Sequence, residues 1–514
     1  MLRKISRNGL VRALSTMTLT SKEVLSTFNN KSLLKSKAYY NGKWIESSDN
    51  RTFRVNNPAL AGSDGEFIAD ITSTTSTDFN TAIESSYVAF QQFKKTSPRY
   101  RSDLLYKLYQ LMIENQQDLA KLIVLENGKA YADALGEIKY AASFFQWFSE
   151  EAPRITGDII HSVVPGNRIL ALKQPIGVCG ILTPWNFPAA MITRKLAAAI
   201  AAGCTVVVKP ASETPLSALA LAYLIDQAGF PADVINILPT DRTEEIGKLV
   251  CEHPLIKKVS FTGSTRVGKI LMSQSASTLK KLSLELGGNA PFIVFGDADI
   301  DKAVEGAYAA KFRASGQTCI CANRLYIHES IYDEFADKFT KKVKATVKLG
   351  NGLDPTVTHG PLIHERSLTK VIEHVEDAVS KGATILEGGK HREDIGEFFH
   401  DLTVLRDVVP GMKITQEETF GPVAALIKFG SDEELLNLAN DTEVGLAGYF
   451  YSQDINRLFK ISEELDVGML GVNTGMISEA ALPFGGIKES GFGREGSKFG
   501  IEDYMIIKSV VVGN

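Results

Sequence analysis

Between residues 175 and 300, strand-like and helix-like segments alternate at short intervals. This alternation predicts an α/β fold with a parallel, doubly wound sheet that is covered by helices on both faces. Ligands of such sheets bind at the carboxyl ends of the strands, which is where Lys209, Gly263 and Ser264 fall. The strand-like runs are residues 176–182, 205–208, 234–238 and 258–261, and the helix-like runs are 196–202 and 216–227, which end at Gly203 and Gly229.

Upstream of this region, the sequence predicts a short strand pair and a group of helices. Residues 39–44 contain an Asn-Gly turn signal at Asn41 and Gly42. Apolar residues recur at three- and four-residue spacing over 79–93 and 104–127, which predicts two helices. Gly128 follows the second as an expected C-cap.

The composition is that of an ordinary globular protein with more than one domain. The chain has 514 residues, of which 44% are hydrophobic and 23% are charged, and its formal net charge is −4. These values disfavour a basic nucleic-acid-binding protein, a disordered chain and a small disulfide-stapled domain. Because the charge balance is not basic, we expect no nucleic acid as a partner. Because the apolar stretches are too short to cross a bilayer, we expect no membrane as a partner either.

The N-terminal segment, residues 1–21, differs from the rest of the chain. It carries four basic residues, several hydroxyl residues and no acid. This composition is typical of a mitochondrial targeting segment and predicts a location in the mitochondrial matrix. A basic tail without a targeting role is the alternative, and a start at Met17 would leave the protein in the cytoplasm.

A glycine-containing segment follows the strand predicted over residues 258–261. It occupies a strand-to-helix junction, where backbone amides at a helix N-terminus suit a pyrophosphate. Its spacing is not that of the usual dinucleotide fingerprint, so a plain turn with Ser/Thr capping is the alternative. The residues are Gly263, Ser264, Thr265, Arg266, Val267 and Gly268.

Cys319 and Cys321 lie on a polar loop between a helical stretch, 303–313, and a strand-like run, 325–327. A loop cysteine becomes a reactive thiolate where nearby amides and a helix terminus lower its pKa. An inert thiol pair or half of a metal site would give the same pattern. The eight histidines show no metal-ligand spacing, so we expect no catalytic metal. The other three cysteines are expected to be packing residues.

Seven short motifs resemble those of the aldehyde dehydrogenase superfamily, and they occur in the family's order over almost the whole chain after residue 35. The resemblance implies an NAD(P)-binding domain over 25–155 and 175–287 and a catalytic domain over 288–487. It also implies an oligomerisation arm from 155–173 and 488–514, and a homodimer or homotetramer. The motifs occupy residues 184–188, 208–211, 261–264, 285–288, 316–319, 417–422 and 483–486.

The resemblance also implies the chemistry. Cys319 would attack the aldehyde carbon, and the side chain of Asn186 with the Cys319 backbone N–H would form the oxyanion hole. After hydride transfer leaves a thioester, Glu285 would activate the hydrolytic water.

The same resemblance places an NAD or NADP cofactor. Lys209 and Ser212 would face the adenosine ribose, and Glu418 with Phe420 the nicotinamide ribose and ring. Many NAD-preferring relatives carry Glu at the position of Ser212, and a neutral side chain there removes the repulsion of a 2′-phosphate. We therefore expect NADP to be accepted and preferred. The remaining expected cofactor contacts are Trp185, Pro210, Ala211, Gly263, Ser264, Thr265, Arg266, Val267 and Gly268.

Arg194, Arg313 and Ser478 match positions that bind the substrate carboxylate in succinate-semialdehyde dehydrogenases. Two guanidinium groups near one thiol suit an aldehyde with a distal carboxylate, whereas ordinary structural ion pairs are the alternative. We therefore expect oxidation of succinate semialdehyde to succinate, the last step of 4-aminobutyrate breakdown, with glutarate semialdehyde as the competing substrate. A catalytically silent member and a coenzyme A-acylating enzyme are less favoured, because Cys319 and Glu285 are both present. The resemblance to semialdehyde dehydrogenases with this Cys-x-Cys also implies a reversible disulfide between Cys321 and Cys319, and a spectator thiol is the alternative.

Overall fold

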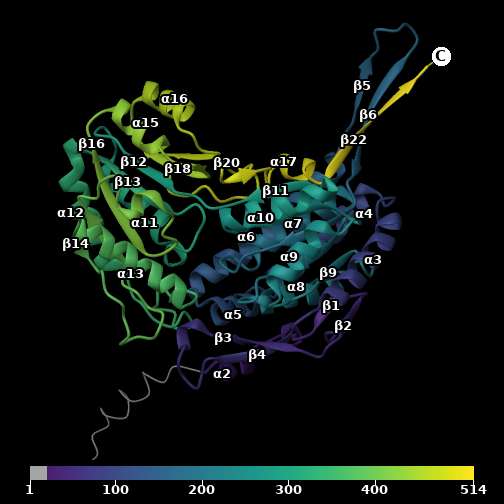
Figure 1. The fold of residues 1–514 in the computed structure, drawn as a ribbon, viewed down its shortest axis with the longest axis horizontal. Coiled ribbons are helices and arrows are strands. Elements are labelled where there is room, and N and C mark those ends of the chain that lie inside the picture. The colour runs from purple at the N-terminus through teal and green to yellow at the C-terminus, as the bar shows by residue number, and fades with distance from the viewer. Residues whose placement is uncertain (1–19, 514) are drawn as a thin grey trace, which may run out of the picture.

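The computed structural model describes residues 20–513 and consists of two α/β lobes and a projecting β arm (Figure 1). Residues 1–19, which hold most of the expected targeting segment, lie outside the described part. Thr20 caps helix α2 (Ser21–Ser26), and Ser21 Oγ donates to the Gly65 carbonyl at 2.9 Å. Thr20 and Ser21, the last two residues of the expected targeting segment, therefore take part in the described fold. Among residues 20–513, no helix is long and apolar enough to cross a membrane.

The first lobe is built on an eight-stranded sheet of order β2-β1-β9-β8-β7-β10-β11-β21. The five strands from β9 to β11 are parallel, as the alternation predicts, whereas β1, β2 and β21 add antiparallel pairs at the edges. The strands are β1 (Ala38–Tyr40), β2 (Lys43–Ile45), β7 (Val178–Leu182), β8 (Thr205–Lys209), β9 (Ile235–Ile237), β10 (Ile256–Thr262), β11 (Lys281–Glu285) and β21 (Gly491–Phe492).

Both faces of this sheet are buried, because successive residues of a strand point to opposite faces. In β8, Val206 and Val208 belong to one apolar cluster and Val207 belongs to another. The covering helices in this lobe are α3 (Ser76–Phe93), α4 (Pro98–Glu114), α5 (Gln116–Asn127), α6 (Tyr131–Glu151), α7 (Ala190–Ala202), α8 (Pro215–Ala228), α9 (Thr243–Glu252) and α10 (Thr265–Ser275).

Local signals fix several element ends. Gly128, Gly203 and Gly229 end their helices at φ values of 81°, 95° and 86°, which confirms the predicted C-caps. The helix predicted over 104–127 is wrong in one respect, since it divides into α4 and α5 at Asn115. Asn115 Nδ2 donates to the Leu111 carbonyl at 2.8 Å, and this side-chain bond competes with helix continuation.

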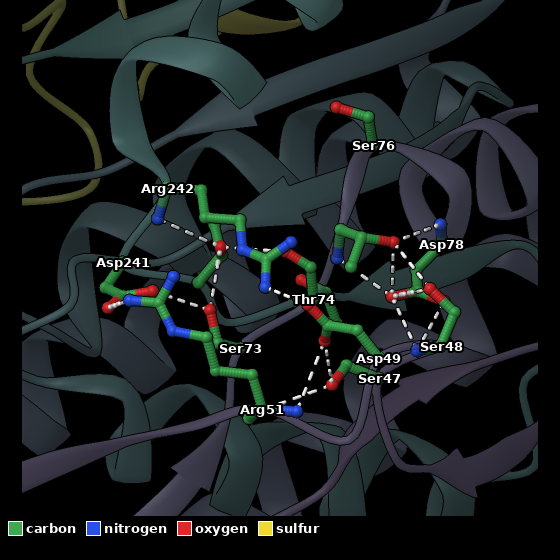
Figure 2. Close-up of polar contacts among 12 residues, drawn as sticks. Ser47, Ser48, Asp49, Arg51, Ser73, Thr74, Ser76, Asp78, Asp241 and Arg242 are labelled. Carbon is green, nitrogen blue, oxygen red and sulfur yellow. Dashed lines mark hydrogen bonds and ion pairs between the residues drawn. The ribbon is translucent and has the colours of Figure 1, made fainter.

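A polar cluster fixes the loop that follows β9, beside the carboxyl ends of the strands (Figure 2). Ser73 Oγ donates to Asp241 Oδ1 at 2.6 Å, and Arg51 pairs with the same carboxylate at 2.6 Å. Arg242 pairs with Asp49, which joins the loop after β2 to the loop after β9. After the loop that follows β2, the chain forms a two-stranded sheet of β3 (Thr52–Asn56) and β4 (Phe67–Thr72).

The second lobe carries a seven-stranded sheet of order β14-β15-β16-β13-β12-β18-β19, parallel except for the β14–β15 pair. Its faces are also both buried: Phe292 and Val294 of β12 join one apolar cluster and Ile293 joins the other. The strands are β12 (Ala290–Val294), β13 (Ala322–His328), β14 (Thr384–Glu387), β15 (Thr403–Arg406), β16 (Val423–Phe429), β18 (Ala447–Tyr451) and β19 (Met469–Val472), with β17 (Val444–Gly445) and β20 (Ile487–Lys488) paired apart. The helices are α11 (Ile300–Phe312), α12 (Tyr332–Thr346), α13 (Glu365–Ser380), α14 (Lys413–Gln416), α15 (Asp432–Asn440) and α16 (Ile455–Glu464).

The arm is a three-stranded antiparallel sheet of β5 (Asp158–His161), β6 (Arg168–Pro175) and β22 (Met505–Val512). It projects away from both lobes (Figure 1). The expected arm segment 488–514 is too long, because β21 pairs with β11 and the short helix α17 (Phe499–Glu502) packs on α7. Residues 491–502 therefore return to the first lobe before the chain enters the arm.

Candidate active site

The loop that carries Cys319 is bent by three successive residues in the left-handed region. Ala314, Ser315 and Gly316 have φ values of 51°, 56° and 74°. A Cβ on Gly316 would lie 2.2 Å from the Gly421 carbonyl oxygen, so this position requires glycine. The Gln317 side chain anchors the bend by accepting from the Ile363 amide at 3.1 Å. Strained backbone of this kind is found where a loop must present a functional group.

Cys319 and Glu285 are brought together by the two lobes. The Cys319 thiol donates to Glu285 Oε1 at 3.0 Å. Glu285 is the last residue of β11, and its register partner on β10, Thr262, donates through Oγ1 to Glu285 Oε2 at 2.7 Å. The expected nucleophile and the expected base are thus in direct contact at the carboxyl end of the first sheet.

The thiol is held in its protonated form. Burial raises the pKa of Cys319 to about 11, the charge of Glu418 adds to this rise, and the charges of Arg194 and Arg313 oppose it. The expectation that a helix terminus would lower this pKa is wrong. The preceding helix, α11, ends at Phe312, so a carboxyl end and not an amino end leads into the loop. Attack by the sulfur therefore requires that Glu285 accept the proton.

The side chain of Asn186 contacts the loop that carries Cys319. Its Nδ2 donates to the Gln317 carbonyl at 3.1 Å, two residues before Cys319. A carboxamide carries two N–H donors, so the second remains available to a developing oxyanion. Lys129 holds the segment that carries Asn186 in place, because its ammonium donates to the Asn186 carbonyl at 2.8 Å and pairs with Glu137 at 2.6 Å.

The structure places Arg194 differently from the expectation. Arg194 is 1% exposed, and its guanidinium pairs with Glu285 and with Glu495. Lys195 pairs with Glu495 too and donates to Thr262 Oγ1 at 2.6 Å. Arg194 thus meets two carboxylates of the protein itself, which matches the structural ion-pair alternative. Sequence reasoning missed Glu495, because nothing local connects it to a helix 300 residues earlier.

Arg313, by contrast, has donors to spare. No carboxylate within residues 20–513 forms an ion pair with it. Its guanidinium lies over the Phe187 ring at 5.2 Å, and one nitrogen is 3.9 Å from the Met476 sulfur. Ser478 is half-buried on the same loop as Met476. Of the two arginines, Arg313 is the one that can donate hydrogen bonds to a carboxylate from outside the protein.

The segment after β10 combines both of its sequence interpretations. Ser264 is the N-cap of α10, and its Oγ accepts from the Val267 amide at 3.4 Å. Gly268 is buried, and a Cβ there would lie 2.5 Å from Leu286. This close packing holds the amino end of α10 at the strand ends, where it suits a pyrophosphate.

Next to Ser212, which is expected to face the adenosine ribose, the structure has a charge that sequence reasoning missed, that of Glu213. Lys209 ends β8, and burial lowers the pKa of its ammonium to about 8. Ser212 follows Pro210 and Ala211, and its hydroxyl donates to Glu213 Oε2 at 3.1 Å. The neutral Ser212 therefore has an acidic neighbour in Glu213.

Glu418, which is expected to contact the nicotinamide ribose, lies near the loop that carries the thiol. Glu418 accepts from the Gly288 amide at 3.4 Å, and burial raises the pKa of Glu418 to about 7. A Cβ on Gly288 would lie 2.8 Å from the Cys319 carbonyl oxygen, so this junction connects Glu418 to the thiol loop. Phe420 packs edge-on against Trp185 with ring centroids 5.6 Å apart. These residues fit a nicotinamide ribose and ring beside the reacting carbon.

Cys321 is a separate, buried thiol. It donates to the Lys311 carbonyl at 3.0 Å, and both it and Cys319 are free cysteines. Within the described part of the chain, no three His, Cys, Asp or Glu residues are grouped so that they could hold a metal ion.

Comparisons with known proteins agree with this geometry. The model of the family described as "Aldehyde dehydrogenase family" matches residues 44–510. The chain is 54% identical to succinate-semialdehyde dehydrogenase [NADP(+)] 1 of Schizosaccharomyces pombe, over 93% of this chain and 95% of that protein. It is 51% identical to glutarate-semialdehyde dehydrogenase of Pseudomonas putida, over 93% and 98% of the two chains. It is 50% identical to human mitochondrial succinate-semialdehyde dehydrogenase, over 94% and 89%.

Solved structures show the same relation. The crystal structure of succinate-semialdehyde dehydrogenase from Burkholderia pseudomallei superimposes with a TM-score of 0.93 at 48% identity. The match covers 95% of this chain and all of that one. The chain therefore belongs to the aldehyde dehydrogenase family, and it is an aldehyde oxidoreductase.

Proposed function

We propose that this protein oxidises succinate semialdehyde to succinate, with NADP preferred over NAD, as the last step of 4-aminobutyrate breakdown. The observation that carries the substrate assignment is Arg313, a guanidinium near the half-buried Cys319 that has no carboxylate partner among residues 20–513. A planar guanidinium binds a carboxylate through two parallel hydrogen bonds. The names of the yeast and human relatives support the same substrate, and the Pseudomonas putida relative makes glutarate semialdehyde the competitor to be measured.

The chemistry follows from the contacts of Cys319. Glu285 Oε1 takes the thiol proton, and the sulfur attacks the aldehyde carbon to give a thiohemiacetal oxyanion. The second N–H of Asn186 and the Cys319 amide stabilise this oxyanion. When bound, NADP supplies the hydride acceptor. Glu285 first releases the thiol proton to solvent and then, as a carboxylate again, accepts a proton from the water that attacks the thioester. The C–S bond breaks, Cys319 leaves as a thiolate that takes up a proton, and succinate departs.

Substitution of Arg313 tests the substrate. Arg313→Ala is expected to raise the KM for succinate semialdehyde at least about 30-fold, because the substrate carboxylate loses its charged partner in a partly buried site. The KM for butanal, which has no carboxylate, should stay within about twofold. Steady-state NADPH absorbance measures both. The matched control is Arg406→Ala, since Arg406 pairs with Asp333 in the second lobe. An unchanged KM for succinate semialdehyde contradicts the assignment.

Cofactor preference rests on Ser212. Ser212→Glu is expected to shift the ratio of kcat/KM values toward NAD by about 100-fold, because a carboxylate there repels a 2′-phosphate. Ser212→Gln is the neutral control of matched size and should keep the preference for NADP. Glu213 is retained in both variants, so the comparison isolates the charge at position 212. Unchanged preference in Ser212→Glu would refute the cofactor proposal.

Cys321 is proposed to protect the nucleophile. Peroxide oxidises Cys319 to a sulfenic acid, and the Cys321 thiol then displaces water to form a disulfide that dithiothreitol reduces. Wild-type activity lost to peroxide should therefore return with dithiothreitol, whereas the activity of Cys321→Ala should not. Equal and irreversible loss in both proteins rules out the disulfide.

The arm supports a proposed homodimer or homotetramer. β5 is an edge strand, and Ile159 on it is 78% exposed, a surface that is an aggregation liability unless another chain covers it. Analytical ultracentrifugation measures the mass, and a monomer would contradict this proposal.

A mitochondrial matrix location is proposed from residues 1–21 and from the name of the human relative. A fluorescent fusion of the full chain distinguishes the matrix from the cytoplasm.

A further inference from the structure

Tyr140 carries a buried hydroxyl for whose O–H proton the described chain offers no acceptor, and the Arg194 guanidinium is the polar group that lies beside it. Its position follows from the packing of α6 on α7. Glu137 of α6 accepts from the Ala189 amide at 3.0 Å, at the start of α7. The packing of these two helices brings the Tyr140 hydroxyl within hydrogen-bonding reach of the Arg194 guanidinium.

The surroundings of this hydroxyl are those of the candidate active site. Burial raises the pKa of Tyr140 most, the positive charges of Arg194 and Arg313 and a hydrogen bond from Arg194 lower it, and the charge of Cys319 raises it. The net effect is a raised pKa, so the phenol stays protonated and remains a donor. The Phe144 ring packs edge-on against the phenol at 4.9 Å and limits its rotation.

The groups around Tyr140 determine which kind of atom can accept its O–H proton. A guanidinium only donates, so the phenolic oxygen faces Arg194 and the O–H proton is left for an acceptor elsewhere. Arg194 already has Glu285 and Glu495 as partners, which reduces what it can offer a substrate. Arg313 is the nearby cation with donors to spare, and a carboxylate bound to Arg313 is the acceptor that would complete the Tyr140 hydroxyl.

We propose that the Tyr140 hydroxyl donates a hydrogen bond to the distal carboxylate of the substrate, beside Arg313. This inference rests on the proposed substrate, an aldehyde that ends in a carboxylate. It makes Tyr140 a specificity residue that supplies part of the recognition the resemblance assigns to Arg194.

The test is Tyr140→Phe, which removes only the hydroxyl. The KM for succinate semialdehyde should rise about 10-fold or more with kcat unchanged, because a hydrogen bond to a charged acceptor is lost from binding and not from the chemical step. The kcat/KM for butanal should not change. Inhibition by the product succinate should weaken by the same factor as the KM rises.

Tyr308→Phe is the matched control. Tyr308 also has a buried hydroxyl without an acceptor in the described chain, but its ring packs against Phe312 and His359, and the variant should leave both substrates and succinate inhibition unchanged. An unchanged KM for succinate semialdehyde in Tyr140→Phe overturns the inference. Equal losses for both aldehydes also overturn it, because they assign the hydroxyl to the reacting carbonyl or to packing. If wild type shows no preference for succinate semialdehyde over butanal, the proposed function fails instead, whatever Tyr140→Phe does.

Discussion

Replacement of Cys319 by alanine is expected to lower kcat by about 10⁴-fold or more, since removal of a catalytic nucleophile in well-studied hydrolases costs up to about 10⁶-fold. The physical reason is that Cys319 supplies the sulfur whose covalent bond to the substrate carbon makes that carbon a hydride donor. NADPH absorbance at saturating succinate semialdehyde measures the loss.

The control for this substitution is Cys251→Ala. Cys251 is fully buried on α9, and we expect activity close to that of wild type from this variant. Tryptophan fluorescence quenching by NADP should show that Cys319→Ala still binds cofactor. Activity of Cys319→Ala within tenfold of wild type contradicts the assigned nucleophile.

Replacement of Glu285 by glutamine should lower steady-state turnover by about 10²- to 10⁴-fold, the usual contribution of a positioned general base. Two steps are affected, because Glu285 contacts the Cys319 thiol and is also the expected base for hydrolysis. Cys319 has a pKa of about 11, so raising the pH from 7 to 9 increases its thiolate fraction. Alkaline pH should therefore restore acylation in the variant, while thioester hydrolysis stays slow.

Stopped-flow absorbance at pH 9 distinguishes the two roles. A burst of NADPH equal to the number of active sites, followed by slow turnover, is the expected result for Glu285→Gln. The control is Glu489→Gln, since Glu489 pairs with Lys269 at the surface and should show wild-type turnover. Steady-state rates of Glu285→Gln equal to those of wild type would exclude Glu285 as the base.

The regular elements of the first lobe were predictable because their signals are local. The glycines at 203 and 229 mark helix ends through backbone conformation, and the buried runs of β7, β8 and β10 read as parallel strands. The division of α4 from α5 was missed, since it depends on one side-chain hydrogen bond of Asn115.

The candidate site was predictable where motifs mark it and not where distant segments meet. Cys319, Glu285 and Asn186 belong to recognisable motifs, and they lie together. The sequence predicts a substrate role for Arg194 because it does not show that Glu495, which follows β21 far along the chain, forms an ion pair with Arg194 in the folded protein. Tyr140 has no motif at all, and its importance appears only after folding, as a buried hydroxyl without an acceptor in the described chain.

In the proposed mechanism an aldehyde bearing a carboxylate becomes bound to Cys319 as a thioester. Peptide mass spectrometry detects this bond in Glu285→Gln that has been quenched in acid after incubation with succinate semialdehyde and NADP at pH 9. One succinyl group is expected on the peptide that contains Cys319, and none when NADP is omitted. NADPH formation that leaves Cys319 unmodified at every quench time would exclude the thioester.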